Sequence, residues 1–277
     1  SDIGSAPTTT TLSERKLEAY VTHAKLGEVW MGQGDTAAHR ISDTDLSGTG
    51  AISEGAEFQS FAGGVKFVKE STDEPQNGSQ RDRDRTVANT YTEIFGSSRK
   101  NRLKYVTPNY KGFTAQASHA MRDYSDVALK YAGEINRVKV AAAVGYASSP
   151  FNSNTSGVGQ SSSKFGRKDY GGGASILLPT GISVGGSYAI RNYAIKHRNN
   201  GSAWSTKLGY QTDIIDSGKT HMAVAYGEGK ALFESTLPAN KPVTSSTFLE
   251  DNSEKIKNIG VYIVQAINAI GTEVYAG

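Results

Sequence analysis

From about residue 127 to the end of this chain, short segments follow one another in which every second residue is apolar or aromatic. The clearest of them contains Val138, Val140, Ala142, Val144 and Tyr146. Because side chains of a β-strand point alternately to the two faces of a sheet, each segment predicts a strand with one apolar and one polar face. A soluble sandwich hides its apolar faces, whereas a membrane barrel turns them to lipid and keeps polar residues around a lumen. Lys, Arg, His and Ser on the polar face therefore favour a barrel.

Similar segments occur in the first half of the chain, and together they predict about a dozen strands. These cover residues 14–25, 27–33, 100–107, 111–121, 126–134, 137–147, 169–178, 181–191, 202–211, 219–227, 256–268 and 271–277. A tilted strand needs about 9–11 residues to cross a bilayer. Short turns alternate with long connections rich in Ser, Asn and Gly, as in outer-membrane barrels. The predicted fold class is therefore all-β, a transmembrane antiparallel β-barrel.

Composition narrows the alternatives. The 277 residues are 37% hydrophobic and contain no run of 18 apolar residues, so no transmembrane helix is expected. The formal net charge of +3 gives no sign of a nucleic-acid surface, and we expect no nucleic-acid partner. There is no Cys, and the five His have no metal-ligand spacing. No nucleophile or acid/base constellation stands out, so we do not expect an enzyme.

Three segments resemble a known family. They are Gly-Glu-Val-Trp-Met-Gly-Gln-Gly-Asp-Thr-Ala at 27–37, Asn-Arg-Leu-Lys-Tyr-Val-Thr-Pro at 101–108 and Val-Gln-Ala-Ile-Asn-Ala at 264–269. They are similar to the strands around the constriction loop and to the penultimate hairpin of Gram-negative porins, with the nearest likeness to the alphaproteobacterial type. The resemblance implies a trimeric outer-membrane channel for passive diffusion of small hydrophilic solutes and ions. It also implies contact with outer-membrane lipid and lipopolysaccharide.

Porins of this family have barrels of about 16 strands. We therefore expect residues 1–277 to form one incomplete barrel domain that lacks strands before Ser1 and after Gly277. The connection at 34–99 would be the constriction loop, inserted in this domain and folded into the lumen. Such a loop is too long to be an ordinary turn.

Candidate pore residues follow from the resemblance and from strand parity. The acids of the loop would face a basic wall, and opposed charges orient polar solutes in a narrow channel. The candidate acids are Asp35, Asp43, Asp45, Glu54 and Glu57. The candidate bases are Lys16, Lys100, Arg102, Lys104, Arg137 and Lys139. Any one of them could also be an ordinary solvated charge.

Other interpretations stay open. Asp43, Asp45 and Glu54 offer the oxygen ligands that Ca²⁺ prefers, although they lack the spacing of an EF-hand, and no other cofactor is expected. Trp30 and Trp204 suit the aromatic girdles of a membrane interface. The alternative function is a surface-exposed, β-rich adhesin or glycan-binding module, whose long loops would form the binding surface.

Overall fold

The computed structural model of the chain describes residues 16–50, 52, 99–121, 123–149, 166–194, 200–230 and 255–277. Within these ranges twelve strands form one antiparallel sheet, which confirms the all-β prediction. The strands are β1 (Leu17–His23), β2 (Gly27–Asp35), β3 (Arg99–Val106), β4 (Phe113–Ala120), β5 (Tyr124–Ile135), β6 (Val138–Ser149), β7 (Arg167–Leu177), β8 (Ile182–Tyr193), β9 (Gly201–Ile215), β10 (Gly218–Lys230), β11 (Lys255–Ile267) and β12 (Thr272–Ala276). A short 3₁₀ turn, Asn268–Ile270, joins the last two.

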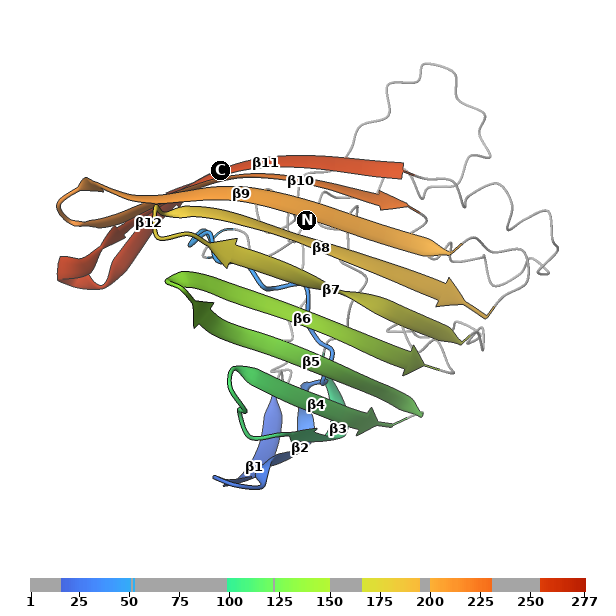
Figure 1. Cartoon of the computed structure of the whole chain (residues 1–277). Coiled ribbons are helices and arrows are strands. Elements are labelled where there is room, and N and C mark those ends of the chain that lie inside the picture. The colour runs from blue at the N-terminus through green and yellow to red at the C-terminus, as the bar shows by residue number, and fades with distance from the viewer. Residues whose placement is uncertain are drawn as a thin grey trace, which may run out of the picture.

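Each strand pairs with its neighbour in sequence, so the sheet is a simple meander that curves through space (Figure 1). Among the described strands, β1 pairs with β2 and β12 pairs with β11, and the sheet is open between these two edges. The strands predicted from the sequence agree well with those observed, but several predicted strands end too early. Strand β9 runs on to Ile215 and β10 to Lys230, because their backbone pairing continues past the last apolar residue of the pattern.

The two faces of the sheet differ as predicted. In β5 the residues from Tyr124 to Leu129 are alternately buried and exposed. Large apolar side chains such as Leu129, Val144 and Leu208 are about half exposed, and they share one face, which we call the outer face. Because lipid is the solvent that accepts an extended apolar surface, this face suits the hydrocarbon core of a bilayer.

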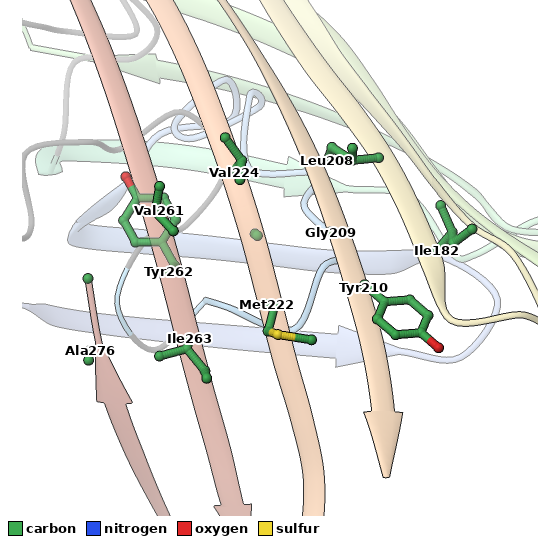
Figure 2. A pocket seen from close by; sticks show the side chains of 12 residues that line it. Ile182, Leu208, Gly209, Tyr210, Met222, Val224, Val261, Tyr262, Ile263 and Ala276 are labelled. Carbon is green, nitrogen blue, oxygen red and sulfur yellow. The ribbon is translucent and has the colours of Figure 1, made fainter. Parts of the chain in front are cut away.

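The outer face carries a shallow apolar groove where β8–β12 lie side by side. Its volume is about 920 Å³, and Leu208, Val224, Val261 and Ile263 lie along it (Figure 2). These residues are the outward-pointing apolar members of their strands. The groove therefore lies on the outer face of the sheet and is separate from the polar face. No helix in the described ranges is both long enough and apolar enough to span a membrane.

The opposite face, which we call the inner face, carries residues 36–50, the segment that follows β2. In the view of Figure 1 this segment passes behind β5–β7. Ile41 and Thr44 lie against the backbone of β6 and β7, where a Cβ added to Gly145 or Gly173 would come within 3 Å of them. Small side chains at inner positions, including Ala128 and Ala143, surround the same segment. The core of the described structure is therefore the contact between residues 36–50 and the inner wall.

Candidate functional site

The segment leaves the sheet beside Arg102 of β3. The guanidinium donates through Nε to the carbonyl of Asp35 (3.0 Å) and through Nη1 to the carbonyl of Gly32 (3.2 Å), and it forms an ion pair with Glu18. Its side chain is completely buried. Arg102 is therefore on the inner face, as parity predicted, but it is a fixed part of the wall.

Asp126 of β5 receives the next residues of the chain. The amides of Ala37 and Ala38 donate to its two carboxylate oxygens at 3.1 and 2.8 Å. Ser118, its direct partner across β4 and β5, and the hydroxyl of Tyr124 also donate to it. These contacts attach the first turn of the segment to the wall.

Farther along, the segment is attached to β7 and β9. Lys207 Nζ lies 2.7 Å from Asp45 Oδ2, and only 5% and 11% of the two side chains are exposed. The amide of Leu46 donates to Ser175, and Gln211 donates to the carbonyl of Leu46. Asp45 therefore lies in a buried ion pair, and residues 36–50 cross the inner face from β4–β5 to β9.

A more accessible group of charges lies near the start of the segment. Lys16 Nζ is 2.5 Å from Asp35 Oδ2, and His39 Nε2 is 3.7 Å from the other oxygen of the same carboxylate. Arg40 forms an ion pair with Asp43 at 2.5 Å. The side chains of Lys16, Asp35 and Arg40 are about one third to one half exposed. Their field can therefore reach a solute that passes along the inner face.

Two wall lysines interact with these acids. Lys104 of β3 is attracted electrostatically by the carboxylate of Asp35, and Lys130 of β5 is attracted by those of both Asp35 and Asp43. Both lysines are only partly exposed. Burial lowers the pKa of His39, and the negative charge of Asp35 opposes this effect. His39 is consequently neutral at pH 7, since a lowered pKa lies below the ordinary value of about 6.5.

One further wall lysine, Lys100, and a tryptophan beside Lys104 complete this region. Lys100 Nζ lies 5.1 Å from the ring centroid of Tyr124, and Lys104 Nζ lies 5.4 Å from that of Trp30. Trp30 stacks on Tyr20 and donates to Glu28. The expectation that Trp30 belongs to an outer aromatic girdle is wrong, because its neighbours Lys104 and Tyr20 share the inner face. Trp204, by contrast, packs on Tyr226 of the outer face.

The remaining candidates are placed differently. Arg137 is not on a strand: with Asn136 it forms the β5–β6 turn, where both residues have positive φ. Lys139 is opposite Glu134 at the short-turn end of β6, six residues or roughly 20 Å from Gly145, where the segment is seated. Neither forms a hydrogen bond or an ion pair with residues 36–50 in the described part of the chain. Glu54 and Glu57 lie outside the described residues.

The calcium hypothesis has no assembled site in the described part of the chain. Asp43 is paired with Arg40 and Asp45 with Lys207, so cations from the protein already neutralise both carboxylates. No group of three metal-binding side chains occurs within the described ranges. Because Glu54 lies outside them, a calcium site stays a prediction.

Sequence reasoning missed Asp126 and Lys207, the wall residues to which the segment is attached. Strand alternation could have identified both residues as inward-pointing, but it could not have identified their partners. A second signal was available: Ala141, Ala143, Gly145 and Ala147 occupy inward positions where a water-filled wall would carry polar residues. Small side chains at successive inward positions indicate that another piece of chain packs there.

The arrangement suits a passage for polar solutes. A polar wall, a segment of chain laid across it and a group of partly exposed charges of both signs can orient a dipole or an ion without bond chemistry. A second wall cluster, Asp169 with Arg191 at 2.8 Å and Arg167 at 3.8 Å, joins β7 to β8.

Comparison with known families gives one match that covers almost the whole chain. Residues 2–277 match the sequence model of the family described as Gram-negative porin. An outer-membrane location goes with that family. None of the curated protein sequences matches the chain significantly. The finer likeness to alphaproteobacterial porins stays a prediction.

Several solved structures are similar at low sequence identity. OmpT of Vibrio cholerae lacking loop L8 is 12% identical with a TM-score of 0.47, over 87% of this chain and 65% of that one. OmpT expressed in the outer membrane is 14% identical with a TM-score of 0.44, over 86% and 61%. An anion-selective porin from Comamonas acidovorans is 17% identical with a TM-score of 0.34, over 75% and 65%. The chain thus spans somewhat less than two thirds of the length of these proteins.

Proposed function

Because this chain belongs to the Gram-negative porin family, we propose that the whole protein forms a water-filled channel for passive diffusion of small hydrophilic solutes and ions. The channel crosses the outer membrane with the outer face of the sheet toward lipid. Strands that complete the barrel would cover the free edges of β1 and β12, since unpaired backbone groups are unfavourable in hydrocarbon.

The observation that supports this proposal is the course of residues 36–50. They lie across the polar face of a sheet whose other face is apolar, and they bring Asp43 into the field of Lys130, which together with Lys104 also faces Asp35 at the end of β2. A loop that narrows a polar lumen and lines it with opposed charges is what a diffusion channel requires.

We further propose an anion preference. Near the start of the segment, the described cations Lys16, Arg40, Lys100, Lys104 and Lys130 outnumber the acids Asp35, Asp43 and Asp126, while Arg102 and Glu18 cancel one another. An excess of fixed positive charge raises the local concentration of anions and lowers that of cations.

The proposed partners follow the family. We propose a homotrimer, surrounded by outer-membrane lipid and lipopolysaccharide, with solutes as the only ligands and no catalytic activity. The adhesin or glycan-binding alternative gains no support from the family match.

Reconstitution of the full-length protein tests the function. The purified protein in a planar bilayer should give stepwise increases in ohmic conductance, and vesicles that contain it should swell in small sugars but not in large polymers. In a salt gradient, the reversal potential should have the sign of anion preference. Membranes that stay silent after insertion of correctly folded protein would refute the channel.

A further inference from the structure

Four donors converge on the carboxylate of Asp126, which is 2% exposed. The amide of Ala37 and the hydroxyl of Ser118 donate to Oδ1. The amide of Ala38 (2.8 Å) and the hydroxyl of Tyr124 (3.2 Å) donate to Oδ2. Two consecutive backbone amides that point at one carboxylate form a charge-assisted anchor for the chain that carries them.

The partners of Asp126 set it apart from the other acids at the inner face. Asp35, Asp43 and Asp45 each face a cation, whereas the hydrogen bonds to Asp126 within the described ranges come from amides and hydroxyls. Its charge therefore holds a turn of backbone in place.

The same turn is held from its other side by Arg102. Arg102 binds the carbonyls of Gly32 and Asp35, just before the amides that Asp126 binds. One wall residue takes the acceptors of the turn and the other takes its donors. The direction in which the chain leaves β2 is therefore fixed, and with it the positions of the ion pair that follows, Arg40 with Asp43.

We propose that Asp126 is a positioning residue of the channel, which fixes the start of residues 36–50 against the wall and so sets the width and steadiness of the passage. This inference rests on the proposed channel function. It assigns Asp126 no contact with the solute. Its effect reaches the solute through the segment that it holds.

Asp126→Asn is the direct test. Each carboxylate oxygen of Asp126 accepts hydrogen bonds from one backbone N–H and one hydroxyl. In either orientation of the Asn side chain, its NH₂ group replaces one of these acceptors and faces a backbone N–H that is itself a donor. The first turn should then detach. We expect open-channel current variance to rise at least twofold, and neutral polymers that the unchanged protein excludes should enter the channel.

Asp169→Asn is the matched control. Asp169 is equally buried on the inner wall, but it forms ion pairs with Arg191 and Arg167 of the wall itself. The Asp169→Asn substitution should lower the resistance of the protein to heat or denaturant without changing current variance or polymer exclusion. If both variants change the current equally, wall stability accounts for the effect and Asp126 has no special role.

A disulfide provides a rescue that a merely structural role would not show. The chain has no native Cys, and a Cβ at position 145 would lie 3.4 Å from the Cβ of Ala38, close to the separation of about 3.5–4.5 Å in disulfides. The tip of the Ile41 side chain must turn aside, and the carbonyl oxygen of Val127, 3.0 Å from the new Cβ, must shift by a few tenths of an ångström. The triple variant carries Ala38→Cys and Gly145→Cys in addition to Asp126→Asn. Its current should be quiet when the disulfide is formed and noisy again when the disulfide is reduced.

The outcomes separate the two proposals. Silent wild-type protein defeats the channel function itself. A conducting wild type with an equally quiet Asp126→Asn variant overturns the positioning role alone. If Asp126→Asn does not fold, Ser118→Ala, which removes one donor to the carboxylate, should give a smaller rise in current variance, and an unchanged current in that variant would count against the anchor.

Discussion

Lys207 of β9 and Asp45 form a 2.7 Å ion pair across 162 residues of chain, and both side chains are almost completely buried. The amide and hydroxyl of Ser47 also donate to this carboxylate, and Lys207 lies 5.4 Å from the ring centroid of Tyr262. A pair so enclosed contributes to the position of residues 36–50 more than to the field in the passage.

The first prediction concerns this pair. Lys207→Met should leave the buried carboxylate of Asp45 without its cation, which costs about 3–5 kcal/mol for an enclosed pair. Hydrogen–deuterium exchange in residues 42–50 should accelerate accordingly. Lys139→Met, at the short-turn end of the same wall, is the control and should change nothing there. The double variant Asp45→Asn with Lys207→Met should exchange more slowly than Lys207→Met alone, and the opposite order would exclude the ion pair as the tether.

The second prediction concerns ion preference. Lys104→Gln with Lys130→Gln should shift the reversal potential toward cations, because Asp35 and Asp43 lose the wall charges that face them. The shift should shrink as salt rises, since the screening length falls from about 30 Å at 0.01 M to about 3 Å at 1 M. Arg102 is left intact because its side chain is buried and holds the backbone. Lys255→Gln, on the outer face, should leave the reversal potential unchanged, and an equal shift in that variant would contradict the assignment.

The third prediction concerns pH. Burial lowers the pKa of His39, while Arg40, Arg99 and Lys16 lower it further and Asp35 raises it. When the segment is detached, His39 has the ordinary histidine pKa of about 6.5, so below that pH it binds a proton that it does not bind in the attached segment. Attachment should therefore be strongest above that pH, weaken as pH falls toward the lowered pKa and level off below it. Current variance measured between pH 7.5 and 5 should rise on acidification, and His39→Gln should remove the rise.

The fourth prediction concerns the outer face. Leu208 and Val224 are direct cross-strand partners and about half exposed. Substitution of either residue by Lys should lower the free energy of unfolding in lipid vesicles by roughly 2–4 kcal/mol if it lies near the bilayer midplane. Ser187→Lys, on the inner face of the neighbouring strand β8, is the control and should cost much less. Equal losses for both faces would show that the outer face is not in lipid.

The strands and their faces could be predicted from the order of the residues alone. Alternation is a local property, so it predicted about a dozen strands and turned Lys100, Arg102 and Lys104 inward without any knowledge of their neighbours. Leu103 and Tyr105, which alternate with these residues, are exposed on the outer face. Where a short turn joins two successive strands, their antiparallel pairing also followed, because a short turn allows no parallel arrangement.

Which charges meet depends on the folded chain and could not be predicted. Parity assigns a residue to a face but not to a partner, and residues 36–50 have no periodicity from which a path could be read. The contacts of Asp126 with Ala37 and Ala38, and of Lys207 with Asp45, join groups 88 to 162 residues apart. They exist because small residues on β6 and β7 leave room for the segment, and because a buried amide or carboxylate needs a partner. That requirement made Arg102, Asp126 and Lys207 parts of the wall and left Lys16, Asp35, Lys104 and Lys130 to face the passage.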